Sequence, residues 1–213
     1  RLAPQVAELA DMAYLHVMGE ALLHPDFPEI AGIAADAGLA LGVTTNGTLF
    51  DTSNAESLLA PPFRQLNISL HSDLSESGMK SVFTFTRRAF TMHPALYINY
   101  RFWNRGEDDE SLMKCLKMIS DEFGVDVCRI PAPGEGFPKI TNRLYLNFAS
   151  LFDWPDLSAP FVPEPAFCHG SVNQFAVLAD GTVTPCCLDN NGSIKLGDAN
   201  THSLKDILHA RRA

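Results

Sequence analysis

Three of the five cysteines lie near the end of the 213-residue chain, and their spacing favours a metal or iron–sulfur site. Cys168 precedes a predicted β-hairpin, with strands at Phe175 to Leu178 and Thr182 to Pro185 joined by the turn Ala179-Asp180-Gly181. Cys186-Cys187 follow directly. The hairpin would return Cys186 toward Cys168, and thiolates are the ligands that iron clusters take.

Other chemistry at these cysteines stays open. Cys168, His169, Cys186 and Cys187 could hold structural zinc, although adjacent ligand pairs fit tetrahedral zinc less well than Cys-x2-Cys spacing. A Cys168–Cys186 disulfide could form in an oxidised sample, and Cys187 could be an ordinary thiol. Cys115 and Cys128 lie in apolar segments, where free cysteine is usually a small buried hydrophobe.

A second group of candidate residues follows a series of predicted strands. Apolar runs end in polar side chains that could bind a ligand, namely Glu20, Thr45, Asn46, Ser69, His71, Asn104 and Arg105. For any single position, the solvent exposure of loops explains a polar residue better than a site does. Their recurrence on the same end of successive strands indicates one functional edge.

Five strands, separated by four helices, would position these residues. The strands are expected at 13–18, 39–43, 65–70, 95–103 and 125–130. Helices are marked by capping-box spacing at Asp26/Glu29 and Ser53/Glu56, and by apolar stripes from Val82 to Met92 and from Leu112 to Phe123. Strict alternation predicts an α/β fold with a mostly parallel sheet and chemistry at its C-terminal strand ends. The periodicity fades from Phe137 to Glu164, which indicates a connector.

Composition excludes several classes. The formal charge of −9 and the lack of a basic run argue against nucleic acid or an anionic membrane as partner. No segment approaches the roughly 20 apolar residues of a membrane span. An odd cysteine count does not suit a disulfide framework, so a reducing compartment, the cytoplasm, is expected.

The runs Gly19-Glu20-Ala21-Leu22, Thr44-Thr45-Asn46-Gly47 and Asn67-Ile68-Ser69-Leu70-His71 resemble radical S-adenosylmethionine (SAM) enzymes after their first strand. The resemblance covers roughly residues 1 to 150 and implies a partial (βα) TIM-like barrel. No CxxxCxxC motif, which holds the 4Fe-4S cluster in that family, occurs in this sequence. Because the chain opens at Arg1 with what resembles the tail of a helix, one upstream strand carrying that motif is expected.

The resemblance implies roles for individual residues. Gly19 and Glu20 would receive the SAM ammonium group, Thr45 and Asn46 would line the pocket, and Ser69 would bond the ribose or the carboxylate. Arg101 would pair with the carboxylate, or alternatively with Glu107 or Asp108. His71 could face substrate.

The C-terminal segment resembles SPASM and twitch domains, which hold auxiliary iron–sulfur clusters. Twelve residues separate Cys168 from Gly181 and four separate Gly181 from Cys186, and Leu196-Gly197-Asp198 continues the pattern. Further cysteines expected after residue 208 are absent from the sequence, so Cys168, Cys186 and Cys187 would supply only part of a ligand set.

The sequence therefore predicts a barrel domain at 1–150, then a connector and a SPASM-like hairpin and helix at 151–213. The implied function is an iron–sulfur oxidoreductase or modifying enzyme that generates a 5'-deoxyadenosyl radical, with a peptide or protein as one substrate class. An electron donor such as ferredoxin or flavodoxin is implied too. The alternative is a non-catalytic half-barrel binding module with a metal-stapled hairpin.

Overall fold

The computed structural model describes residues 1–70, 75–104, 110–126, 138–150, 154–155, 158 and 169–209. Their contacts form two compact units. The first, here called the sheet unit, comprises Asp11–His16 and Glu20–Leu151. The second, the hairpin unit, comprises Arg1–Ala10, Val17–Gly19 and Phe152–Ala213.

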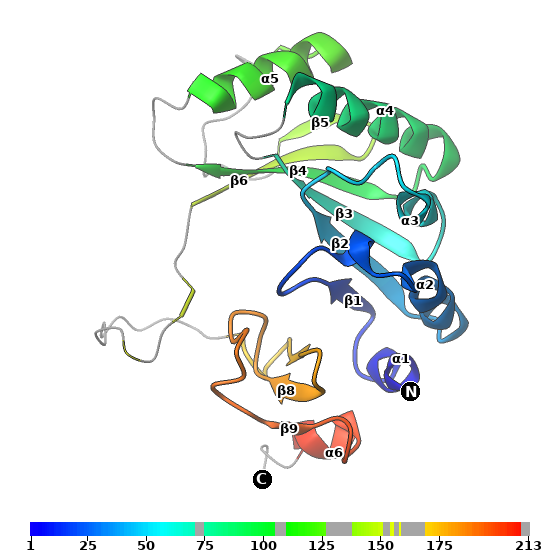
Figure 1. Ribbon diagram of the computed structural model, residues 1–213, viewed down its shortest axis with the longest axis vertical. Helices are drawn as coiled ribbons and strands as arrows, with labels where there is room; N and C mark the ends of the chain where they lie inside the picture. Colours follow the sequence, from blue (N-terminus) through cyan, green and yellow to red (C-terminus); the bar gives the residue numbers. More distant parts are fainter. Residues whose placement is uncertain are drawn as a thin grey trace. The chain divides into compact units, whose positions relative to one another are not determined.

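The sheet unit is built on a six-stranded sheet in the order β1-β2-β3-β4-β6-β5 (Figure 1). Its strands are β1 (Met12–Leu15), β2 (Ala40–Thr45), β3 (Phe63–Ser69), β4 (Tyr97–Asn104), β5 (Lys139–Thr141) and β6 (Leu144–Ser150). Every neighbouring pair is parallel except β5 with β6. The predicted mostly parallel α/β fold is confirmed. Within the described residues β1 and β5 are free edges, so the sheet is open and no barrel closes.

The helices of this unit lie on one side of the sheet (Figure 1). They are the 3-10 turns η1 (Ala21–Leu23) and η2 (Ser57–Leu59) and the α-helices α2 (Phe27–Asp36), α3 (Ser53–Glu56), α4 (Glu76–Met92) and α5 (Glu110–Phe123). Val43, Ile68 and Tyr100 are fully buried against this layer, with Val82 and Phe85 of α4 among their buried counterparts. The core thus lies between the helices and one face of the sheet.

The sheet contains a strand, β6 (Leu144–Ser150), that the sequence did not predict. β6 was not expected, because 137–164 was interpreted as a connector, yet Leu144 and Leu146 are fully buried. Their alternation with Tyr145 and Asn147 is the period of a strand, and β6 pairs with β4 from Ile98↔Leu144 onward. The strand expected at 125–130 falls largely outside the described residues.

β1 is an edge strand rather than a fully buried one. Tyr14 is 41% exposed, and Met18, predicted to end this strand, is 66% exposed. With a single neighbour, β2, only one side of β1 is protected by pairing. An apolar run in the sequence therefore does not by itself imply a strand that is buried on both sides.

The predicted capping boxes are wrong in detail. Asp26 precedes α2 but makes no side-chain cap bond, and its N–H donates instead to His24 Nδ1 (3.1 Å). Thr52, not Ser53, is the N-cap of α3, and Glu56 pairs with Arg88. The helices were still correctly placed, because Pro28 in the first turn of α2 and Gly38 after it (φ +71°) mark its two ends.

The hairpin unit has a small core of its own. Its elements are α1 (Leu2–Ala7), β7 (Ala176–Val177), β8 (Thr182–Thr184), β9 (Gly197–Asp198) and α6 (Leu204–His209). The strands form an antiparallel sheet in the order β7-β8-β9, which confirms the predicted hairpin. Buried Val183, Leu204 and Ile207 pack with Val6 and Leu9 from the N-terminal segment.

Candidate functional site

Glu20 joins the loop after β1 to the end of β2. Its Oε2 accepts hydrogen bonds from Thr45 Oγ1 and from the Asn46 N–H, both at 3.0 Å, and its Oε1 accepts from the Leu22 N–H at 3.2 Å. Thr45 is buried, whereas Glu20 is half-buried and Asn46 is exposed. The structure thus brings together three residues that the sequence selected. The donors in these three bonds are all neutral, and a carboxylate so placed is a suitable acceptor for a cationic group of a ligand.

Ser69 lies beside this group at the same edge of the sheet. Thr45 pairs with Ile68 in the parallel register of β2 and β3, so Asn46 and Ser69 occupy the next positions of neighbouring strands. Ser69 in turn pairs with Arg101 of β4. Thr45, Asn46, Ser69 and Arg101 therefore occupy adjoining register positions, at the ends of β2 and β3 and three residues before the end of β4.

Gly19 belongs to the hairpin unit. Its φ of +81° lies in the left-handed region, and an added Cβ would meet nothing within 4 Å. Backbone conformation, not lack of space, favours glycine here.

Arg101 is half-buried and its guanidinium lies over the Trp103 ring, 5.0 Å from the ring centroid. Burial lowers the pKa of Arg101, but an arginine remains charged at any physiological pH. Its alternative partners Glu107 and Asp108 lie outside the described residues, as do His71 and Arg105. Asn104 ends β4.

The face of the sheet opposite the helices is polar, and sequence reasoning missed most of it. In the register, Thr44 of β2, Asn67 of β3 and Asn99 of β4 stand side by side. Tyr14, Gln65, Ser69 and Arg101 lie on the same face, because side chains two residues apart in a strand share a side. The available signal was polar residues at every second position of otherwise apolar strands, such as Gln65, Asn67 and Ser69.

His16 follows β1 on this face, with its ring 5.5 Å from that of Tyr14. Partial burial and, to a lesser degree, the positive charge of Arg101 lower the pKa of His16 below its ordinary value of 6.5. The imidazole is therefore neutral at neutral pH. It adds a group that can donate and accept hydrogen bonds beside a permanent cation.

The hairpin unit presents the cysteines. Cys186 and Cys187 lie shortly after β8 and are half-buried. Burial, and to a lesser degree the neighbouring Cys186, raises the pKa of the Cys187 thiol. Cys168 lies outside the described residues, but Ser171, three residues later, donates its N–H to the Pro185 carbonyl at 3.0 Å. That bond fixes the segment after Cys168 beside the residue preceding Cys186. In the described part of the chain no cluster of three metal-binding side chains is assembled.

Glycine is required at two positions of this segment because a larger side chain would not fit there. Gly181 has a φ of +91°, and a Cβ there would collide with the side-chain amide of Asn200, which donates to the Asp180 carbonyl at 2.7 Å. At Gly197 a Cβ would lie 2.8 Å from Ile207 of α6. The turn and the docking of α6 both require glycine.

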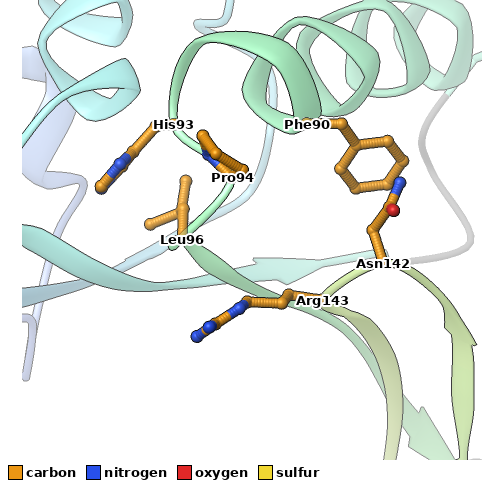
Figure 2. Close-up of a pocket in the computed structure, with 6 residues that line it drawn as sticks. All are labelled: Phe90, His93, Pro94, Leu96, Asn142 and Arg143. Carbon is orange, nitrogen blue, oxygen red and sulfur yellow. The ribbon is translucent and has the colours of Figure 1, made fainter.

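A cavity of about 260 Å³ lies at the opposite end of the strands, lined by Phe90, His93, Pro94, Leu96, Asn142 and Arg143 (Figure 2). Its polar groups already have partners: His93 Nε2 bonds the Phe63 carbonyl at 2.6 Å, and Arg143 Nη1 donates to the Ala95 carbonyl at 3.3 Å. Arg143 also stacks on Tyr97. Figure 2 shows the His93 and Arg143 side chains directed to the same side, away from Phe90 and Asn142. We therefore assign the functional edge to the Glu20 end.

Residues 168–213 match the family described as SPASM, an iron–sulfur cluster-binding domain. The sequence-based resemblance of this segment is thereby confirmed. No curated protein matches the chain. None of the helices in the described residues is long and apolar enough to cross a bilayer.

Three solved structures are similar over part or nearly all of the chain. They are BtrN in an open conformation (15% identity, TM-score 0.49, 98% of this chain and 64% of that chain), BtrN in complex with AdoMet and 2-DOIA (14%, 0.45, 98% and 66%) and archaeal TYW1 (18%, 0.36, 53% and 50%). The chain thus spans 64% of the BtrN chain that it matches in the open conformation.

Proposed function

We propose that this chain, whose residues 168–213 match the SPASM iron–sulfur cluster-binding family, is part of a radical SAM enzyme. The observation that carries the proposal is the placement of Glu20, Thr45, Asn46, Ser69 and Arg101 along one edge of a parallel sheet. These residues stand in the motifs that resemble the radical SAM family. The open sheet, covered by helices on one side only, is the form expected of a partial TIM-like barrel whose polar face is its inner surface.

In this proposal the edge residues bind SAM. The Glu20 carboxylate and the Gly19-Glu20 backbone would receive the ammonium group, and Arg101 would hold the carboxylate through two parallel N–H bonds. Ser69, adjacent to Arg101 in the register, would bond the ribose or the same carboxylate. A reduced 4Fe-4S cluster, whose ligand motif does not occur in this sequence, would supply the electron for generating the 5'-deoxyadenosyl radical that abstracts hydrogen from the substrate. The residues described here would orient the cofactor.

The hairpin unit would hold part of an auxiliary cluster. Cys168 and Cys186 are the proposed ligands, with Cys187 as a candidate third, since their thiolates suit iron. A peptide or protein substrate, a ferredoxin or flavodoxin as electron donor, and a cytoplasmic location belong to the same proposal. They follow from the family resemblance and from the chemistry of reduced thiols.

Anaerobic reconstitution of the chain with iron and sulfide tests the cluster assignment. We expect bound iron and sulfide with a sulfur-to-iron charge-transfer band, lost when Cys168 and Cys186 are both changed to alanine. Cys115→Ala is the matched control, because Cys115 is buried on α5 in the other unit. Zinc bound without sulfide would overturn the assignment.

Calorimetric titration with SAM tests the edge site. Arg101→Gln should weaken SAM binding about tenfold or more, since hydrogen bonds to a charged group contribute roughly 1.5–3 kcal/mol. Arg88→Gln removes an equal charge from the exposed face of α4 and should leave affinity unchanged. Equal affinities for the two variants would contradict the site and favour the non-catalytic binding module.

A further inference from the structure

A hydrogen-bonded row of side chains crosses the polar face of the sheet. Tyr14 Oη donates to Gln65 Oε1 at 2.8 Å, and Gln65 Nε2 donates to Asn67 Oδ1 at 3.0 Å. Asn99 Nδ2 donates to the same Oδ1 at 2.9 Å, and Asn67 Nδ2 donates to Thr44 Oγ1 at 3.3 Å. We call Tyr14, Thr44, Gln65, Asn67 and Asn99 the amide row. It links four parallel strands through one residue, Asn67.

Asn67 is the fixed centre of this row. It is only 8% exposed and uses both its acceptor and its donor group on neighbours, so it orients the others instead of meeting a ligand itself. Asn99 is half-exposed, and its Oδ1 has no partner among the described residues. The same holds for the hydroxyl hydrogen of Thr44. The row therefore has one acceptor, Asn99 Oδ1, and one donor, the Thr44 hydroxyl, that can serve a ligand.

Gly42 shows that the sheet accommodates this row. A Cβ at Gly42 would lie 2.5 Å from Tyr14 Cδ1 and Cε1, so the tyrosine ring lies directly against β2 at this glycine. In this position its hydroxyl reaches Gln65 on β3. An aromatic surface beside fixed amides is a common construction of small-molecule sites.

The row contains no charged side chain, and the two charged side chains that act on it in the described part of the chain, Arg64 and Arg101, are cations. Arg64 lies near Tyr14. Arg101 lies near His16 and follows Asn99 by two residues along β4, on the same face of the sheet. An ammonium group is therefore disfavoured, and a carboxylate would find its partner at Arg101 instead of at the amides. Groups that donate and accept without charge, hydroxyl or amide, match the row.

We propose that the amide row binds an uncharged hydroxyl or amide part of the substrate, with Asn67 as its positioning residue. This inference rests on the proposed function, since it names the substrate chemistry of the same enzyme. The two sources of such groups, a polyol and a peptide backbone, share this chemistry. Suitable probes are myo-inositol for the first and N-acetylglycinamide for the second.

The test is a titration of the asparagine-labelled chain followed by the side-chain amide NMR signals. We expect a saturable shift of the Asn67 and Asn99 signals with one neutral probe, and the probe that acts identifies the source. Asn99→Ala should weaken that binding about fivefold to tenfold, the effect of roughly one hydrogen bond. Asn142→Gly is the control, since Asn142 lies on the β5–β6 turn at the other end of the strands and its φ of +44° suits glycine.

Asn67→Asp guards against simple misfolding, because it keeps the two accepted bonds and replaces the donor to Thr44 with a carboxylate oxygen, which takes up the Thr44 hydroxyl hydrogen. We expect it to retain the wild-type spectrum elsewhere but to bind the neutral probe at least about fivefold more weakly. Shifts caused only by acetate or propylammonium, or no shift with any probe, would overturn the inference. The titration needs no cluster, so failed iron and sulfide loading with intact probe binding would refute the proposed function alone.

Discussion

At the scale of single residues, one buried hydroxyl pair shows how the sheet unit is held together. Tyr100 is fully buried, and its Oη lies 2.7 Å from Thr86 Oγ1, which also donates to the Val82 carbonyl at 2.9 Å. Because Thr86 uses its hydrogen on Val82, Tyr100 is the donor of the pair. Burial raises the pKa of Tyr100 far above its ordinary value, so this donor keeps its proton.

Removing either partner should have unequal effects on stability. Tyr100→Phe leaves Thr86 bonded to Val82 and should lower the free energy of unfolding by about 1 kcal/mol. Thr86→Val leaves a buried tyrosine hydroxyl without its acceptor and should lower it by about 1–3 kcal/mol. Urea denaturation followed by tyrosine fluorescence compares the two. A larger loss for Tyr100→Phe would contradict the assigned donor.

His16 gives a pH-dependent prediction. Its pKa is lowered in the folded chain, so the folded state binds fewer protons than the unfolded state as pH falls below 6.5. The contribution of His16 to stability is therefore unfavourable at low pH and vanishes as pH rises past the unfolded value. An NMR titration should place its pKa below 6.5, and Arg101→Gln should raise it only partly, because burial is the larger cause. If the pKa of His16 returned fully to 6.5 in Arg101→Gln, burial would not be the larger cause of its shift.

The residues of the candidate site could be predicted only where a motif named them. Glu20, Thr45 and Asn46 were selected from their order in the chain, and hydrogen bonds join them. Asn67 and Asn99 were not selected, although they alternate with buried Ile68 and Ile98. Their significance depends on cross-strand register, which a single sequence does not specify.

At the scale of elements, the order of strands and helices followed from periodicity, while local caps did not. Both capping boxes failed because a spacing of three residues permits the bond without requiring it. β6 was missed because Leu144 to Ser150 follows a long segment without clear periodicity. Long, strongly amphipathic helices such as α4 and α5 were the most predictable parts.

The turn between β7 and β8 carries an element-level prediction. Gly181→Ala should lower the melting temperature of the hairpin unit, since left-handed backbone alone disfavours alanine by about 1–2 kcal/mol and the Asn200 amide must also move. Gly32→Ala is the matched control, because Gly32 lies within α2 where an added Cβ meets nothing. That change should raise stability by roughly 0.5–1 kcal/mol. Differential scanning calorimetry measures both, and a neutral Gly181→Ala would contradict the steric account.

At the scale of the whole molecule, binding at one unit should leave a distinct signature. If the cysteines of the hairpin unit take up a cluster, mass action stabilises the unit that holds it. Hydrogen exchange should then slow in β7, β8, β9 and α6. It should also slow in α1, whose Val6 packs into the same core, and remain unchanged in β2 and β3. Uniform protection of both units would argue against separate cores.

The origin of the hairpin unit in two distant parts of the chain has a consequence during synthesis. Gln5 Oε1 accepts the Leu204 N–H at 2.9 Å, and Leu2, Val6 and Leu9 pack against residues near the other end of the sequence. On the ribosome these apolar side chains emerge well before Leu204 and Ile207 and stay unpartnered until those residues have been synthesised. The sheet unit can fold in the meantime, so the nascent segment Arg1–Ala10 is where a chaperone would be needed longest.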